Sequence, residues 1–133
     1  MTFSGTSVWI TGASSGIGEA LSYDLSRRGA RLILSSRRED ALHAVRERCA
    51  RPDEHRVVPL DLADPNSIQA AADDVLSTTN AVDVLVNNGG ISQRSTARET
   101  DMAVVRKVME VNFFGTVGLT QAVLPTMLGR QRG

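Results

Sequence analysis

Residues 11–18, with the sequence TGASSGIG, hold three glycines at fixed spacing. Gly12 lets the chain leave a strand in a tight turn, and Gly16 lets a pyrophosphate approach the backbone where a Cβ would block it. Gly18 lets a following helix lie close on a sheet. The positive end of that helix and its free N–H groups attract phosphate. The run therefore predicts a dinucleotide-binding turn, with hydroxyl donors from the two serines inside it, Ser14 and Ser15.

The end of the next apolar run indicates which dinucleotide binds. A site that prefers NAD carries an acidic residue about 20 residues after the glycines, bound to the ribose 2′-hydroxyl. Here Ser36 occupies that position and Arg37 follows it. A guanidinium pairs with a 2′-phosphate, assisted by Ser36 and Arg38, and one charge-assisted bond of about 1.5–3 kcal/mol gives about ten- to a hundredfold preference. The sequence predicts NADP(H), unless the two arginines are only a solvated helix start.

These residues are positioned by alternating strand and helix patterns. Short apolar runs predict four strands, at residues 7–11, 31–35, 56–60 and 82–87. Apolar residues at helical spacing predict four helices, at 16–28, 36–49, from 65 onward after Asp64 as N-cap, and at 100–128. The second of these helices is expected to open with a capping box from Ser36 to Glu39.

Strand and helix alternation predicts an α/β fold, a Rossmann-like doubly wound parallel sheet. With 133 residues and no linker or repeat, one domain over residues 1–133 is expected. A P-loop is excluded because it needs Gly-Lys-Ser/Thr, and Lys107 is the chain's single lysine.

Composition excludes several other classes. Lys and Arg together number 15, as do Asp and Glu, so no basic excess indicates a nucleic-acid partner. No segment is expected to reach the roughly 20 apolar residues of a membrane-spanning helix, and no signal peptide is recognised. Cys49 is the only cysteine, and His43 and His55 have no ligand spacing, so no metal site is expected. A cytoplasmic protein is the default.

The motifs TGASSGIG, LDLAD and VDVLVNNGG, followed by a mid-helix VN at 111–112, resemble the short-chain dehydrogenase/reductase family in order and spacing. The match is to the compact single-domain branch and covers essentially the whole chain. The run NNGGISQRS is similar to the dehydrogenase/reductase member-seven subgroup, whose members usually begin with a membrane-anchoring segment that is not recognised here.

The resemblance implies a role for each matching residue. The pyrophosphate and nicotinamide side would be lined by Gly12, Ser14, Ser15, Gly16, Ile17 and Gly18. The adenine edge would be contacted by Asp61 and Leu62. The adenosine ribose would be closed over by Asn87, Asn88, Gly89 and Gly90, with Gly89 replacing the family's usual alanine. Asn112 matches the asparagine that kinks its helix and holds a water in a proton relay, the only catalytic residue implied within this chain.

The family's proton donor is a tyrosine in a Tyr-x-x-x-Lys motif, helped by a serine on the fifth strand. Tyr23 and Lys107 are the only residues of their types, so the motif does not occur. The sequence is expected to end before the fifth strand, which would leave the isolated chain inactive and its fold either marginal or completed by another chain. The fourth strand would then be an uncovered edge through which the chain self-associates.

Three functions are therefore weighed. The first is the cofactor-binding portion of an NADP-dependent oxidoreductase that acts on a small carbonyl or alcohol substrate. The second is a non-catalytic dinucleotide-binding module, or a partner of a full-length relative. The third is an enzyme with other chemistry, such as an isomerase or epimerase, using an acid that the sequence does not identify.

Overall fold

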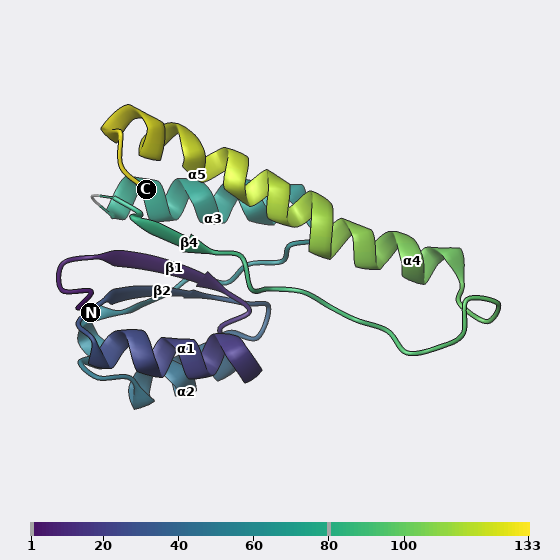
Figure 1. Ribbon diagram of the computed structural model, residues 1–133, viewed down its shortest axis with the longest axis horizontal. Helices are drawn as coiled ribbons and strands as arrows, with labels where there is room; N and C mark the ends of the chain where they lie inside the picture. Colours follow the sequence, from purple (N-terminus) through teal and green to yellow (C-terminus); the bar gives the residue numbers. More distant parts are fainter. Residues whose placement is uncertain (1, 80) are drawn as a thin grey trace.

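The computed structural model describes residues 2–79 and 81–133, and strands and helices alternate along them (Figure 1). The strands are β1 (Ser7–Thr11), β2 (Arg31–Ser35), β3 (Arg56–Val57) and β4 (Val84–Val86). The helices are α1 (Gly16–Arg27), α2 (Glu39–Arg48), α3 (Pro65–Thr78), α4 (Met102–Met109) and α5 (Thr116–Arg130). A 3₁₀ turn, η1 (Pro52–Glu54), precedes β3, and a π-helical segment, η2 (Glu110–Gly115), joins α4 to α5.

The four strands form one parallel sheet in the order β3-β2-β1-β4. In its register, Trp9 of β1 lies between Ile33 of β2 and Leu85 of β4. This order confirms the predicted fold class, and it places β4 at one edge of the sheet. Among the described residues, β4 pairs with β1 alone.

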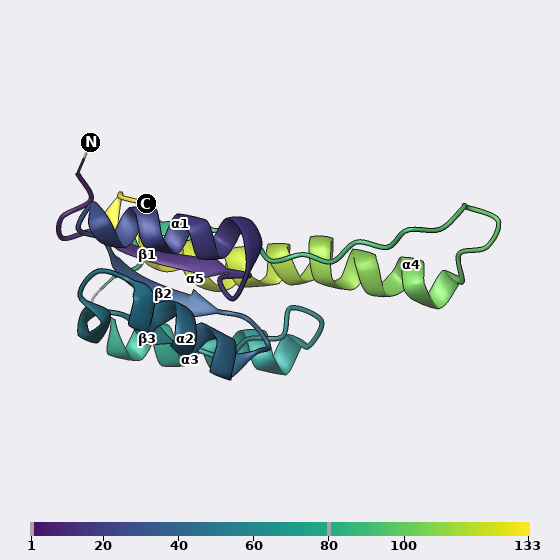
Figure 2. The ribbon, with the colours of Figure 1, turned by 90° about the horizontal axis from the view of Figure 1, so that it is seen from below.

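Helices cover both faces of the sheet, with α1 and α2 on one face and α3 and α5 on the other (Figures 1 and 2). The alternation of a strand sends successive side chains to opposite faces. Val8 and Ile10 therefore join the cluster under α1 and α2, while Trp9 joins the cluster under α3 and α5. All three side chains are fully buried.

Two side-chain hydrogen bonds link β1, β2 and the residue that follows β3. The indole Nε1–H of Trp9 donates to Ser35 Oγ over 2.9 Å, and the Ser35 hydroxyl donates to the carbonyl oxygen of Val58 over 2.6 Å. Both bonds are buried. They satisfy the polar atoms of a fully buried indole and hydroxyl, as burial requires.

The helix predicted over 36–49 begins later, at Glu39, and the predicted capping box is wrong. Arg38 is the N-cap residue, and no side chain caps the helix. The Ser36 hydroxyl instead accepts the backbone N–H of Arg38 over 3.1 Å, in a local turn. Ser36 therefore remains in the loop after β2.

Two strands are shorter than predicted. The strand expected over 56–60 is regular only at Arg56–Val57. The chain still follows β2, since Val58 N–H and Leu60 N–H donate to the carbonyl oxygens of Leu34 and Ser36 over 3.0 Å each. The strand expected over 82–87 is regular at Val84–Val86.

The helix predicted over 100–128 runs from Met102 to Arg130 with η2 in its middle. Its second half packs against α3, with Leu119 and Val123 fully buried. Its first half, α4, projects past the sheet (Figure 1), and within the described part of the chain no α4 residue is buried.

By length and composition alone, the helix 102–130 would be long and apolar enough to cross a membrane. It has 29 residues, and its most apolar window has a mean hydropathy of 1.2 with 22% of that window buried. The expectation that no segment approaches these values was therefore wrong. Core helices of water-soluble proteins and signal sequences also meet these criteria, and α5 packs against α3.

Candidate functional site

The glycine-rich turn lies between β1 and α1, at the carboxyl end of the sheet. Gly12 has φ +65° and Gly16 has φ +58°, a left-handed conformation that favours glycine. Ser15 is the N-cap of α1, with extended backbone and no hydrogen bond from its side chain to the first turn. A Cβ added to Gly16 would meet no heavy atom within 4 Å. The backbone at the start of α1 is therefore not covered by other protein atoms at Gly16.

Gly18 brings α1 close to the turn that precedes it. A Cβ built on Gly18 would overlap the carbonyl oxygen of Gly12 and lie 2.7 Å from Asn88 Nδ2. Real Cβ atoms do not make such contacts with backbone, so only glycine fits here. This is the close packing of helix on sheet that the spacing of the glycines predicts.

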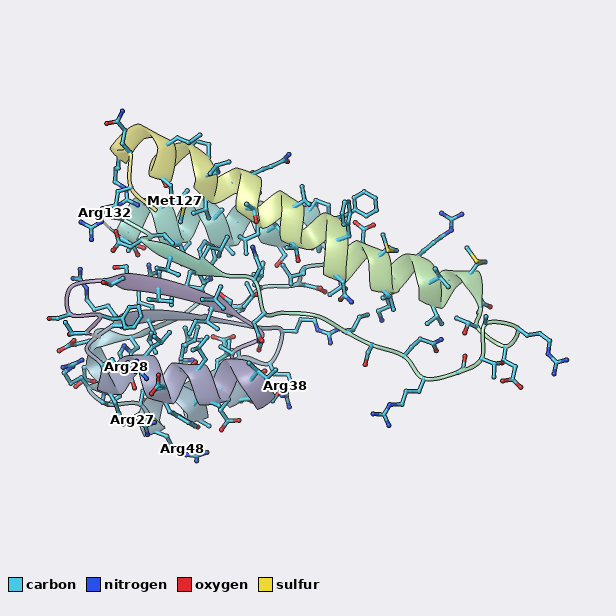
Figure 3. The ribbon with its side chains drawn as sticks, in the orientation of Figure 1. Arg27, Arg28, Arg38, Arg48, Met127 and Arg132 are labelled. Carbon is cyan, nitrogen blue, oxygen red and sulfur yellow. The ribbon has the colours of Figure 1, made fainter. Side chains whose placement is uncertain are left out.

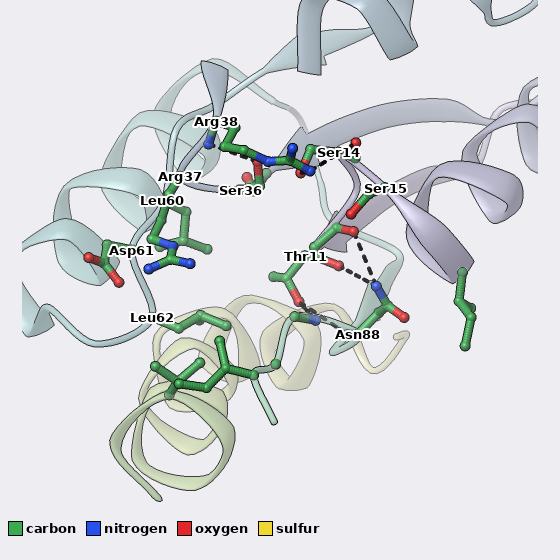
Figure 4. Close-up of a pocket in the computed structure, with 17 residues that line it drawn as sticks. Thr11, Ser14, Ser15, Ser36, Arg37, Arg38, Leu60, Asp61, Leu62 and Asn88 are labelled. Atoms are coloured by element: carbon green, nitrogen blue, oxygen red, sulfur yellow. Dashed lines mark hydrogen bonds between the residues drawn. The ribbon is translucent and has the colours of Figure 1, made fainter. Parts of the chain in front are cut away.

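Thr11 and Asn88 connect the turn to the end of β4. Thr11 Oγ1 accepts the backbone N–H groups of Asn88 and Gly89 over 3.1 and 2.8 Å. The side-chain amide of Asn88 donates to the carbonyl oxygens of Thr11 and Gly12 over 3.0 and 3.3 Å (Figure 4). The two loops are therefore held as one unit.

The loop after β2 carries the two arginines. Arg38 reaches across to the start of α1, where its Nη2 lies 3.3 Å from Ser14 Oγ and 3.5 Å from the Ser14 carbonyl oxygen (Figures 3 and 4). The Arg37 guanidinium points to the other side, toward Asp61 and Leu62 (Figure 4). Among the described residues, neither arginine forms an ion pair with a carboxylate.

The loop between β3 and α3 forms the opposite wall. Asp61 N–H donates to Ser67 Oγ over 2.9 Å, and Asp61 Oδ1 accepts the N–H of Ala63 over 2.9 Å. Asp64 caps α3 by accepting the N–H of Asn66, as predicted. These bonds fix the loop, so that Leu62 is held with only 8% of its surface exposed.

Asn112 lies in η2 and forms hydrogen bonds with the loop after β4. Its Oδ1 accepts the N–H of Ile91 and its Nδ2 donates to the Ile91 carbonyl oxygen, both over 2.8 Å. The side chain thus satisfies both backbone groups of one residue. The π-helical turn around it departs from regular α-helix at the position where a kink is expected.

Most of the predicted residues line one cavity of about 360 Å³ (Figure 4). The predicted residues in its wall are Gly12, Ser14, Ser15, Ile17, Ser36, Arg37, Asp61, Leu62, Asn88, Gly89 and Gly90. Gly16 and Gly18 shape the backbone behind this wall. Asn112 reaches the wall through Ile91, which lines the cavity.

Asn87 does not lie at the cavity. Its side-chain amide donates to Thr120 Oγ1 on α5 over 3.0 Å. Neighbouring residues at the end of a strand point to opposite faces of the sheet, so the side chains of Asn87 and Asn88 point in opposite directions. The expected ribose contact of Asn87 is not supported by its position, whereas its contact with α5 secures the end of β4.

Sequence reasoning missed several residues of the wall. They are Thr11, Ser35, Leu60, Ile91 and Val111. Thr11 could have been found, because a hydroxyl at the start of the glycine run can bind the neighbouring loop. The others are ordinary strand or helix residues with no distinguishing pattern. Among the described residues, no three His, Cys, Asp or Glu side chains form a metal-binding group.

A family model for short chain dehydrogenases matches residues 6–133. Over 131 residues the chain is 49% identical to dehydrogenase/reductase SDR family member 7 of Homo sapiens, covering 95% of this chain and 39% of that protein. It is 44% identical over 131 residues to member 7B of Mus musculus, covering 95% of this chain and 41% of that protein. The chain therefore spans less than half the length of these curated relatives.

Solved structures show the same arrangement. A short-chain dehydrogenase from Streptomyces avermitilis has a TM-score of 0.91 and 38% identity, over 100% of this chain and 48% of that one. A metagenomic short-chain oxidoreductase in complex with NADP has a TM-score of 0.91 and 32% identity, over 98% and 60%. A gluconate 5-dehydrogenase from Burkholderia cenocepacia, in complex with NADP and tartrate, has a TM-score of 0.89 and 29% identity, over 99% and 52%.

The resemblance drawn from the glycine run and the motifs after it is confirmed by these matches, because the family model covers nearly the whole chain. The chain belongs to the short-chain dehydrogenase family.

Proposed function

We propose that the chain forms the NADP(H)-binding portion of a short-chain oxidoreductase that transfers hydride between NADPH and a carbonyl or alcohol substrate. One observation carries the proposal. The cavity joins the open start of α1 to a loop that presents Ser36 where a site for NAD would present an acid, with Arg37 directly after it. The complexes with NADP among the similar structures support this choice of nucleotide.

The diphosphate fits the turn between β1 and α1. Gly16 has φ +58° and no heavy atom near the place of a Cβ, so its backbone is accessible to a ligand. The start of α1 also carries the positive end of the helix dipole. Ser14 and Ser15 add hydroxyl donors at the wall of the cavity. These groups bind an anion without supplying a side-chain charge of their own.

The 2′-phosphate fits between the two arginines. Arg37 and Arg38 both line the cavity, and their guanidinium groups point to opposite sides of it. Ser36, between β2 and Arg37, carries a hydroxyl rather than a carboxylate, so no negative charge repels a phosphoryl group at that place. A charge-assisted bond of about 1.5–3 kcal/mol corresponds to about ten- to a hundredfold preference for NADP(H) over NAD(H).

Bound NADPH supplies the hydride, and the protein must supply the geometry and the proton. We assign to Asn112 the positioning of the loop at Ile91 and, by its resemblance to the family's asparagine, a water of the proton relay. The chain offers no Tyr-x-x-x-Lys to donate the proton. The Tyr23 hydroxyl donates to Glu19 Oε1 over 2.7 Å on α1, and Tyr23 does not line the cavity.

The 133-residue chain is therefore expected to bind the nucleotide without turnover. A second candidate function, a non-catalytic dinucleotide-binding module or a partner of a full-length relative, is favoured by the same missing motif. The coding sequence after Gly133 distinguishes the two candidate functions. A continuing reading frame that encodes a strand, a serine and Tyr-x-x-x-Lys would favour the oxidoreductase.

The experiment is a titration of the 133-residue chain with NADPH, followed by nucleotide fluorescence, with the folded state checked by circular dichroism. Saturable binding without oxidation of NADPH on a panel of aldehydes and ketones is the expected result. Turnover would overturn the expected inactivity, because a proton donor other than the family tyrosine would then have to act. Absence of binding by a folded sample would overturn the proposed function itself.

A further inference from the structure

Trp9 is the single tryptophan of the chain, and its side chain is fully buried on β1. It pairs with Ile33 of β2, and side chains two residues apart share a face, so Ser35 lies diagonally ahead of it on the same face. An aromatic side chain reaches such a neighbour. The indole Nε1–H donates to Ser35 Oγ over 2.9 Å. Leucine or phenylalanine could fill this place in the core, but neither side chain donates a hydrogen bond.

Ser35 is the last residue of β2 and stands just before the loop that carries Arg37. Its carbonyl oxygen accepts the N–H of Ala13 in the glycine-rich turn over 3.1 Å, and its hydroxyl donates to the Val58 carbonyl oxygen over 2.6 Å. A hydroxyl has one hydrogen, and an indole N–H can only donate. The bond from Trp9 therefore uses the Ser35 hydroxyl as an acceptor and leaves its hydrogen directed at Val58.

The bond from Ser35 to Val58 joins two walls of the cavity at their base. Just beyond it, Leu60 N–H donates to the carbonyl oxygen of Ser36 over 3.0 Å. Ser36 leads to Arg37 and Leu60 leads to Asp61, and these four residues line the cavity. The Arg37 guanidinium points toward the loop that carries Asp61 (Figure 4). The spacing of the two loops at their base therefore determines where that guanidinium lies relative to the opposite wall.

The indole also packs with the second of these loops. Trp9 belongs to the same buried cluster as Val58, Leu60 and Leu62, which follow β3 along the chain. Ser35, Leu60 and Leu62 all lie in the cavity wall. One side chain thus bonds to the end of β2 and packs in the cluster that supports the loop after β3.

We propose that Trp9 is a positioning residue for the choice of nucleotide. Through Ser35 it fixes the spacing between the loop that carries Arg37 and the loop that carries Asp61, and so holds the guanidinium where a 2′-phosphate reaches it. A charge-assisted hydrogen bond weakens steeply when its geometry is lost, whereas NADH has no 2′-phosphate to form that bond. This inference rests on the proposed function, since it concerns the same cavity.

The test measures the ratio of NADPH affinity to NADH affinity by calorimetry in four proteins: the unchanged chain, Trp9→Phe, Ser35→Ala and the double variant. Each single substitution lowers the ratio about threefold or more, because residues in one hydrogen-bond network are coupled. The double variant has the ratio of Ser35→Ala to within about twofold, since both substitutions remove the bond at the same hydroxyl. Losses that multiply in the double variant overturn the inference.

Leu119→Ala is the matched control. Leu119 is fully buried in the same cluster but does not line the cavity, so its substitution lowers the thermal midpoint and leaves the ratio unchanged. An equal fall of the ratio in Leu119→Ala means that general loosening of the core moves it, and this result overturns the inference. A lower thermal midpoint of Trp9→Phe with an unchanged ratio means a purely structural role for Trp9 and overturns it too.

Because the chain has one tryptophan, Trp9 can also be replaced by benzothienylalanine, in which a sulfur atom takes the place of the indole N–H and the ring shape is kept. This protein is expected to fold even where Trp9→Phe does not, and to show the same fall of the ratio. An unchanged ratio, or failure of both proteins to fold, overturns the inference.

The proposed function and the role of Trp9 fail in different ways. If the unchanged, folded chain binds no NADPH, the proposed function fails. If it binds NADPH more tightly than NADH and the Trp9 and Ser35 variants keep the same ratio, only the role of Trp9 fails.

Discussion

Asn88 and Thr11 are joined by two hydrogen bonds, from Asn88 N–H to Thr11 Oγ1 over 3.1 Å and from Asn88 Nδ2 to the Thr11 carbonyl oxygen over 3.0 Å. These residues are 77 positions apart. The bonds join the last residue of β1 to the loop after β4, which are neighbouring strands of the sheet. They hold two walls of the cavity in one relative position.

Asn88→Ala is expected to lower both stability and nucleotide affinity. The change removes the donor to the carbonyl oxygens of Thr11 and Gly12, and leaving such groups without a partner costs about 1–3 kcal/mol. Urea denaturation measures the loss. Asn66→Ala, at an exposed position of α3, is the control and is expected to stay within about 0.5 kcal/mol of the unchanged chain. Equal stability of the two variants would contradict the role given to Asn88.

Arg37→Asp is expected to reverse the choice of nucleotide. A carboxylate at that place repels a 2′-phosphate and accepts a hydrogen bond from a 2′-hydroxyl. NADPH affinity should fall by about ten- to a hundredfold while NADH affinity rises. Arg98→Asp is the matched change of charge, at an exposed position that does not line the cavity, and should leave both affinities as they are. The assignment of Arg37 fails if the ratio of the two affinities is the same before and after its substitution.

Acid is expected to destabilise the fold through His55, which lies between the end of α2 and β2. Its Nδ1 accepts the N–H of Leu32 over 3.2 Å, so its Nε2 carries the proton and donates to the Ala50 carbonyl oxygen over 2.8 Å. A second proton on Nδ1 would break the bond to Leu32. Burial lowers the pKa of His55 below its usual 6.5.

Because the unfolded chain binds a proton at His55 more readily than the folded chain, the stabilisation is complete above about pH 6.5 and is lost as the pH falls below that value. The free energy of unfolding, measured from pH 7.5 to 5, should therefore decrease. His55→Gln should flatten this dependence even though it lowers stability at pH 7.5. His43→Gln, on the exposed side of α2, should keep it. A slope that survives His55→Gln would assign the effect to another group.

Self-association is expected through β4. Among the described residues its outer edge has no paired strand, and Val84 is exposed on it. Unpaired N–H and C=O groups on an apolar edge strand favour pairing with another chain, and a lysine on the edge opposes this pairing. Sedimentation velocity should show association that Val84→Lys reduces. Ala44→Lys, on the exposed side of α2, adds the same charge elsewhere and should not reduce it.

The order of the elements could be predicted from the sequence because each depends on local patterns. The glycine run at 12, 16 and 18 predicts the turn between β1 and α1, and Asp64 before Pro65 predicts the start of α3. The predicted start of α2 was wrong because one side chain can form either of two local hydrogen bonds. Ser36 binds the N–H of Arg38 rather than capping α2 from the predicted position.

The tertiary contacts of the site could not be predicted, because they join residues far apart in sequence. From the sequence, Gly115 would only be expected to destabilise an apolar helix. In the structure glycine is required at this position, because the Leu62 carbonyl group lies where a Cβ would be. Asn87 and Asn88 are adjacent, but only the geometry at the end of β4 separates their partners, Thr120 and Thr11. Asn112, in the π-helical segment, likewise binds Ile91, which lies 21 residues before it.

The most direct test is isothermal titration calorimetry of the folded 133-residue chain with NADPH and, separately, with NADH. The bare backbone at Gly16 and the guanidinium of Arg37 predict saturable binding of both nucleotides, with NADPH about ten- to a hundredfold tighter. Heat with neither nucleotide would contradict the assignment of the cavity as a dinucleotide site. Equal affinity for the two would contradict the role of Arg37.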